Sequence, residues 1–190
     1  MLDPKPARKR DRIALVGISG SGKSTVASVA AARLGWRAFD SDRVIEHRTG
    51  RTIPDLFANE GEAAFRELEA GAIAALPGEP RIILATGGGA PTTEAGRRAL
   101  STFLVIWLRI SPEVAAARLM ANPDTEKRPL LAGDTLARLR ILAESRRHMY
   151  ATSADVIIDV DGLTPSEVAD AVAAACQEHQ HQPTEAQTNP

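Results

Sequence analysis

The sequence has 190 residues, of which 44% are hydrophobic and 25% charged, and its formal net charge at pH 7 is −1. This composition is typical of a soluble globular domain and excludes collagen-like, low-complexity and disulfide-rich proteins, since one cysteine cannot form an internal disulfide. The balanced charge gives no reason to expect nucleic acid or an acidic membrane as a partner, and no apolar run reaches the roughly 18 residues that span a bilayer, so we expect one cytoplasmic domain.

Both ends of the chain are too polar to belong to a packed core. Residues 1–11 combine proline with lysine and arginine, and residues 179–190 are almost wholly polar. Such segments cannot bury enough apolar surface to offset the entropy lost on ordering. We therefore expect a flexible basic N-terminal tail, a single domain over residues 12–178 and a disordered C-terminal tail.

Within this domain, short apolar runs alternate with longer helical patterns. In chain order, the pattern predicts strand 13–16, helix 24–34, strand 37–39, helices 44–47, 53–59 and 61–76, strand 81–85, strand 103–108, helices 111–120 and 135–150, strand 156–160 and helix 166–177. Breaks are expected at Gly50, Pro54 and Pro77. Strands that alternate with helices indicate an α/β protein, with a parallel sheet covered by helices on both faces.

Residues 17–25, GISGSGKST, contain the pattern GxxxxGK[ST] between a predicted strand and a predicted helix. Glycines there let backbone N–H groups close around phosphate oxygens, and the helix directs its positive end at the same anion. Lys23 can reach the β- and γ-phosphates, and the Ser24 hydroxyl can bind Mg²⁺. The motif predicts a nucleoside triphosphate site but does not identify the phosphate acceptor.

Two carboxylates, Asp40 and Asp42, follow the second predicted strand. In an extended chain, residues two apart point the same way, so both could face the nucleotide. One could help to hold Mg²⁺, and the other could accept a proton from an attacking hydroxyl. The alternative is that Asp40 or Ser41 caps the following helix.

An arginine and a glycine triplet are further candidates. Arg66 and Glu69 share a helix face, which favours either an oriented anion clamp or an ordinary surface pair. The triplet 87–89 directly follows a strand, where it fits close approach of a ligand better than a plain loop.

The polar segment 121–134, between two predicted helices, has the character of a mobile lid. Arg128 in this segment could stabilise charge on the transferring phosphoryl group. Arg146 and Arg147 lie near the end of the next helix, where basic residues also simply favour the helix dipole. No histidine or cysteine spacing indicates a zinc site.

Taken in order over residues 13–159, these features resemble the shikimate kinase family. The matching pieces are GISGSGKST at 17–25, FDSD at 39–42, IE at 45–46, TG at 49–50, residues 53–57, GExxFRxxE at 61–69, GGG at 87–89, RPLL at 128–131, and Arg146 four residues before Tyr150. Many kinases share the phosphate loop, whereas the later set in this order is much more specific.

The resemblance implies a three-layer fold of the P-loop NTPase type, with a five-stranded parallel sheet and a lid over residues 121–134. It implies transfer of the γ-phosphoryl group of MgATP to the 3-hydroxyl of shikimate, a step toward chorismate and the aromatic amino acids. The partners implied are ATP, shikimate and one Mg²⁺ per subunit, with no nucleic acid and no membrane, and we expect a monomer.

The resemblance also assigns roles to particular positions. ATP would contact Gly20, Ser21, Gly22, Lys23, Ser24, Thr25, Arg118 near the adenine, and the lid residue Arg128. Shikimate would contact Asp42, Arg66, Gly88 and Arg146, with the two arginines on its carboxylate. Ser24 and Asp40 would lie on the Mg²⁺ side, and Lys23, Asp42 and Arg128 would be catalytic.

Two departures and two alternatives stand beside this interpretation. Ala27 replaces a glycine that is usual in the family, and His148 replaces a proline, which leaves Arg147 as a second candidate for the role of Arg146. Gluconate kinases have a loop similar to residues 17–27, but they place a histidine where this chain has Ile45 and lack the glycine triplet. A non-catalytic ATP-binding module would be expected to lose Lys23, Asp42 or Arg128.

Overall fold

The computed structural model describes residues 11–76, 80–121 and 134–181. In this part of the chain, five parallel strands form one sheet in the order β2-β3-β1-β4-β5. Their bounds are β1 (Arg12–Val16), β2 (Arg37–Asp40), β3 (Ile82–Ala85), β4 (Leu104–Arg109) and β5 (Val156–Asp159). The predicted α/β class and the five-stranded parallel sheet are therefore confirmed.

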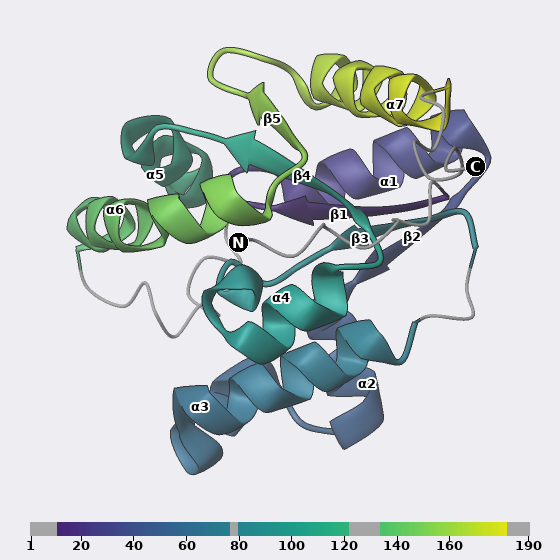
Figure 1. Cartoon of the computed structure of the whole chain (residues 1–190). Helices are drawn as coiled ribbons and strands as arrows, with labels where there is room; N and C mark the ends of the chain where they lie inside the picture. Colours follow the sequence, from purple (N-terminus) through teal and green to yellow (C-terminus); the bar gives the residue numbers. More distant parts are fainter. Residues whose placement is uncertain (1–10, 77–79, 122–133, 182–190) are drawn as a thin grey trace, which may run out of the picture.

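Helices cover both faces of this sheet. Figure 1 shows α1 and α7 together on one face and α4 and α6 on the opposite face. The bounds are α1 (Lys23–Leu34), α2 (Ser41–Thr49), α3 (Ile53–Ala74), the 3₁₀ helix η1 (Ala90–Thr92), α4 (Glu94–Leu100), α5 (Pro112–Met120), α6 (Thr135–Ser153) and α7 (Pro165–His181). None of the helices described here is long and apolar enough to cross a bilayer.

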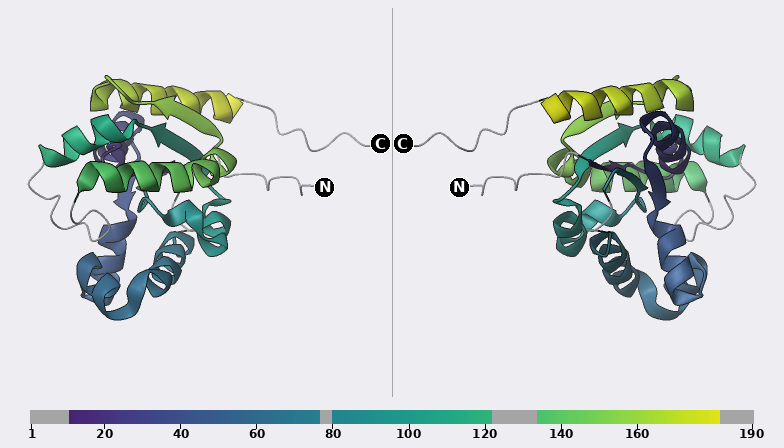
Figure 2. Two further views of the ribbon diagram at one scale, coloured as in Figure 1. Left: turned by 90° about the vertical axis from the view of Figure 1, so that its left-hand side faces the viewer. Right: turned by 90° about the vertical axis from the view of Figure 1, so that its right-hand side faces the viewer.

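The apolar runs in the sequence become the centre of the sheet. All residues of β1 and β3 are buried, as expected for strands covered on both faces. Trp107 is buried in the same core, whereas Trp36 is partly buried and packs against it. A second, small cluster holds α2 against α3, and these two helices project from the sheet as a lobe, as Figure 2 shows. We call residues 41–74 the α2–α3 lobe.

Three features of the helices differ from the sequence prediction. Pro54 does not break a helix but lies in the first turn of α3, where a missing N–H costs nothing. The expected interruption near residue 60 is a kink within α3 at Gly61, whose φ is +80°. The last helix continues to His181, past residue 178 where the domain was expected to end.

Two elements after the glycine triplet were not predicted at all. They are η1 and α4, which together fill much of the segment between β3 and β4. A Cβ on Gly96 would lie 1.8 Å from the carbonyl oxygen of Ala90, so the glycine permits close contact between the two elements. A seven-residue helix with a glycine inside it is too short and irregular for hydrophobic periodicity to reveal.

Strand register brings the sequence motifs to one edge. Asp40 at the end of β2 pairs with Ala85 at the end of β3, and Leu15 near the end of β1 pairs with Ala85 as well. The phosphate loop, the paired carboxylates and the glycine triplet all follow these strand ends. Parallel strands thus collect the candidate residues at the carboxyl edge of the sheet.

Candidate active site

The loop between β1 and α1 turns on three glycines with positive φ. These are Gly17 at +145°, Gly20 at +87° and Gly22 at +87°. A Cβ on Gly20 would lie 2.7 Å from the carbonyl oxygen of Ala115, which shows how closely the loop packs against α5. The strand–loop–helix context predicted for residues 17–25 is confirmed.

Lys23 is the first residue of α1, and its side chain folds back over the loop. Its Nζ donates to the carbonyl oxygens of Gly17 at 2.8 Å and Ile18 at 3.0 Å. The side chain is buried and lines the cleft described below. The ammonium group therefore lies inside the loop that is predicted to bind phosphate.

Asp40 joins the loop helix to the α2–α3 lobe. The Ser24 hydroxyl donates to Asp40 Oδ2 at 2.6 Å, and Asp40 Oδ1 accepts from the backbone N–H of Asp42 at 3.0 Å and of Arg43 at 3.4 Å. The capping role and a position beside Ser24 thus occur together. The expected extended conformation is found at Asp40 but is wrong for Ser41 and Asp42, because this cap starts α2 at Ser41 and places Asp42 in its first turn.

The oxygens of Ser24 and Asp40 fit a hard cation. Mg²⁺ prefers oxygen ligands and usually keeps several waters and phosphate oxygens around one or two protein groups. Within the described ranges, no group of three or more His, Cys, Asp or Glu side chains could hold a metal ion. One hydroxyl and one carboxylate form a donor set suited to Mg²⁺ that arrives with a nucleotide.

Arg66 is a buried residue with two carboxylate partners. Its Nη1 donates to Glu69 Oε2 at 2.6 Å, and its Nη2 donates to Glu62 Oε1 at 3.0 Å. Arg66 is 6% exposed and Glu69 only 1%, so the alternative of an ordinary surface pair is wrong. Burial opposes the charge of Arg66, but the two carboxylates outweigh it and raise the pKa of the guanidinium.

Arg146 reaches the same place from α6. Its side chain is 11% exposed, and its Nη2 lies 3.9 Å from Glu62 Oε1. Arg147 and His148 are exposed, and α6 continues through both without a break. The structure thus places Arg146, and not Arg147, beside Arg66.

Tyr150, one turn after Arg146, is buried, and its hydroxyl donates to the carbonyl oxygen of Gly88. Burial raises the pKa of this phenol to about 12, against an opposing effect of Arg146. The hydroxyl therefore stays protonated and connects α6 to the glycine triplet.

The three glycines of the triplet have different neighbours. A Cβ on Gly87 would lie 2.1 Å from Glu69 Oε1, and one on Gly89 would lie 2.2 Å from Arg66 Cζ. A Cβ on Gly88 would come no closer than 3.4 Å to any neighbour, namely Arg146 Nη1 and the carbonyl oxygen of Gly17. Close approach to the triplet was predicted for a ligand, but at Gly87 and Gly89 it is made by the protein's own Glu69 and Arg66.

One cleft of about 780 Å³ connects these groups. The site residues predicted from the sequence that line this cleft are Gly20, Gly22, Lys23, Ser24, Thr25, Asp40, Asp42, Arg66, Gly88, Arg118 and Arg146. Ser21 is buried behind them in the loop, and Arg128 falls outside the described residues. At one end, Arg118 Nη2 donates to the carbonyl oxygens of Val160 at 2.9 Å and Leu163 at 3.2 Å, which ties it to the loop before α7.

Sequence reasoning missed several lining residues. Phe57 and Phe65 pack next to Arg66 with tilted rings whose centroids are 4.6 Å apart. Both rings line the cleft, as do Arg43 and Thr86. The aromatic pair lies within the matched family motifs, but the sequence is equally consistent with both residues belonging to the hydrophobic core. Arg43 carried no signal, because a basic residue in the first turn of a helix is usually just solvated.

Comparison with known proteins identifies the family. A protein-family model described as shikimate kinase matches residues 19–177 of this chain. The chain is 42% identical over 168 residues to the shikimate kinase of Symbiobacterium thermophilum, covering 87% of this chain and 96% of that one. It is 46% identical over 153 residues to that of Thiobacillus denitrificans, covering 80% and 82%.

Solved structures agree with these relatives. The shikimate kinase of Acinetobacter baumannii in complex with shikimate superposes with a TM-score of 0.83 at 33% identity, covering 90% of this chain and 96% of that chain. The structure from Bacteroides thetaiotaomicron gives 0.79 at 30% identity, covering 90% and 98%. With the family model spanning most of the sequence and the same fold in its relatives, this chain belongs to the shikimate kinase family of ATP-dependent kinases.

Proposed function

We propose that this chain transfers the γ-phosphoryl group of MgATP to the 3-hydroxyl of shikimate and releases shikimate 3-phosphate and ADP. The observation that carries the proposal is one cleft with a phosphate loop in one part and two arginines, the buried Arg66 and the largely buried Arg146, in another.

The nucleotide would lie against the loop from Gly20 to Thr25, with Arg118 near its adenine. Lys23 would leave the carbonyl oxygens of Gly17 and Ile18 and contact the β- and γ-phosphates. Ser24 and Asp40 would hold Mg²⁺, which neutralises phosphate charge when it is bound. Arg128 of the lid would add a cation at the γ-phosphoryl group as charge redistributes there.

The acceptor would lie between Asp42 and the two arginines. Arg66 and Arg146 would bind its carboxylate, because a guanidinium can match a carboxylate with two parallel hydrogen bonds. Asp42 would accept the proton as the acceptor oxygen forms its bond to the γ-phosphorus and the bond to the ADP oxygen breaks. The Gly88 backbone would contact the acceptor, and its position at the cleft supports this.

A substrate panel tests the proposal directly. Purified protein is given MgATP with shikimate, with gluconate or with no acceptor; ADP release is followed by a coupled assay and the product by ³¹P NMR. We expect shikimate-dependent turnover with phosphate on the 3-oxygen, and no shikimate turnover by a folded Lys23→Ala variant. A preference for gluconate would indicate a sugar-acid kinase, and nucleotide binding without turnover would indicate a non-catalytic module.

A further inference from the structure

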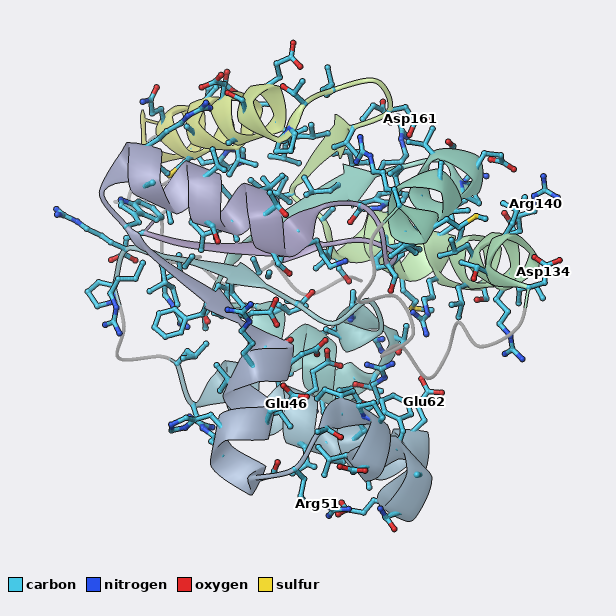
Figure 3. The ribbon with its side chains drawn as sticks, turned by 180° about the vertical axis from the view of Figure 1, so that it is seen from behind. Glu46, Arg51, Glu62, Asp134, Arg140 and Asp161 are labelled. Carbon is cyan, nitrogen blue, oxygen red and sulfur yellow. The ribbon has the colours of Figure 1, made fainter. Side chains whose placement is uncertain are left out.

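Two carboxyl groups contact the paired arginines, and they differ in exposure. Glu69 is 1% exposed, whereas Glu62 is 49% exposed. Glu62 Oε1 accepts from Arg66 Nη2 at 3.0 Å and lies 3.9 Å from Arg146 Nη2, so one half-exposed carboxylate reaches both guanidinium groups. Figure 3 shows Glu62 on the edge of α3 that faces the rest of the domain, while Arg51 lies at the far end of the lobe.

Arg66 keeps its place without help from Glu62. The buried Glu69 holds Nη1 at 2.6 Å, and the guanidinium carbon lies 5.2 Å from the centre of the Phe65 ring. The guanidinium also packs so closely against Gly89 that a Cβ there would lie 2.2 Å from Cζ. Because burial, an ion pair and ring contact already fix Arg66, a positioning role for Glu62 is not needed.

The charge of Glu62 has a different effect. Two neighbouring guanidinium groups, each largely removed from water, are costly unless a negative charge offsets them. Glu62 supplies that charge in the free protein, but it approaches the same donors that an acceptor carboxylate would use. Since its side chain is half exposed, it can turn toward water when another carboxylate arrives.

We infer that the Glu62 carboxylate competes with the carboxylate of the acceptor for Arg66 and Arg146. It weakens substrate binding and in exchange stabilises the ligand-free protein. The inference rests on the proposed function, because it takes a carboxylate-bearing acceptor as the ligand of these arginines.

The size of the effect follows from the exposure of Glu62. An ion pair that is half open to water contributes little, so its removal changes a binding constant by about two- to fivefold. Glu62→Gln should therefore lower the Kd for shikimate by about that factor and leave the KM for ATP unchanged. The methyl ester of shikimate lacks the carboxylate, so its Kd should not fall in the variant.

The experiment measures Kd by calorimetry for shikimate and its methyl ester with wild type, Glu62→Gln and Glu67→Gln. Glu67 lies on the same helix and is exposed, but unlike Glu62 it forms no ion pair with Arg66 or Arg146, so it controls for the loss of one negative charge. We expect tighter shikimate binding only in Glu62→Gln. An unchanged or higher Kd, an equal gain in Glu67→Gln, or an equal gain with the ester would overturn the inference.

Thermal unfolding supplies a second readout. Without ligand, Glu62→Gln should unfold at a lower temperature than Glu67→Gln, and shikimate should raise its Tm by more than it raises that of the wild type. Glu62→Asp keeps the charge but shortens its reach, so it should fall between wild type and Glu62→Gln in Kd. A wild type that binds no shikimate refutes both this inference and the proposed function, whereas a wild type that turns over shikimate beside a variant with unchanged Kd refutes the inference alone.

Discussion

At the scale of single residues, the proposed function makes a sharp prediction for Asp42. It lies in the first turn of α2, lines the cleft, and one of its oxygens would be 3.3 Å from a Cβ placed on Gly87. If Asp42 accepts the proton of the acceptor hydroxyl, Asp42→Asn should lower kcat roughly a hundredfold or more. Steady-state kinetics with circular dichroism as a check on folding measures this, and a change confined to KM would mean that Asp42 only binds substrate.

A second prediction concerns Tyr150 and the dependence of stability on pH. It is the only tyrosine in the sequence, so tyrosinate absorbance reports on it alone. Burial raises its pKa to about 12 in the folded protein, so the folded state keeps the proton longer than the unfolded chain, whose tyrosine titrates near 10. The contribution of Tyr150 to the free energy of unfolding should then stay constant below pH 10 and decrease as the pH rises toward 12.

The matched variant for this titration is Tyr150→Phe. It should be less stable at neutral pH by about 1 kcal/mol, because the carbonyl of Gly88 loses its donor, but it should lose less stability between pH 10 and 12. Urea unfolding at a series of pH values measures both effects. A midpoint near 10 for the tyrosinate signal of the folded protein would contradict the buried, hydrogen-bonded phenol.

Arg66 shows why residue-level sequence reasoning could name the site but not describe it. Spacing of three residues predicts that Arg66 and Glu69 can pair. It cannot show that the pair is buried, since the groups that cover it, such as Gly89 and Arg146, lie far away in the sequence. Burial excludes the surface pair that spacing left open, whereas the anion-binding role that the resemblance assigns to Arg66 stays a prediction.

At the scale of elements, substitutions in the glycine triplet should separate effects on stability from effects on shikimate binding. In Gly89→Ala, the added Cβ would meet the buried Arg66 guanidinium at 2.2 Å. We expect about 1–3 kcal/mol of lost stability from this overpacking, together with a higher KM for shikimate. In Gly88→Ala the closest neighbours are 3.4 Å away, so stability should change less while the KM for shikimate still rises.

Gly71→Ala is the control for these variants. Gly71 lies in α3, is exposed, and has open space where a Cβ would stand. Replacing a glycine inside a helix should raise stability by about 0.5–1 kcal/mol without changing either KM. Urea denaturation and steady-state kinetics on all three variants measure the pattern. Loss of stability in Gly88→Ala equal to that in Gly89→Ala would contradict the packing described here.

The predicted elements differ in how well the sequence identified them. Buried strands were found because parallel strands covered on both faces are continuous apolar runs, as in β1 and β3. The short α4 was missed because it has too few residues to show a period. The start of α2 was placed too late, because the cap formed by Asp40 was treated as an alternative to its place beside Ser24, whereas one carboxylate does both.

At the scale of the whole molecule, the site draws on many separate parts of the chain. The phosphate loop follows β1, Asp40 ends β2 and Asp42 lies just after it, and the triplet follows β3, while Arg66, Arg118 and Arg146 come from α3, α5 and α6. Alternation of strands and helices predicted the common sheet edge. It could not predict that Tyr150 links α6 to the triplet, because that contact spans 62 residues.

The proposed function requires that Arg66 and Arg146 hold the carboxylate of an acceptor that is phosphorylated in the other part of the same cleft. The most direct test is a cycle of four measurements: kcat and KM of wild type and Arg66→Lys, each with shikimate and with its methyl ester. Lysine keeps the charge but loses the bidentate geometry, and the ester removes the ligand charge. Each change alone should raise KM roughly ten- to a hundredfold, as expected for loss of a charged hydrogen bond. The ester should add little further penalty in Arg66→Lys, because the interaction that it removes is already lost. Penalties that simply add would show that Arg66 does not hold the carboxylate.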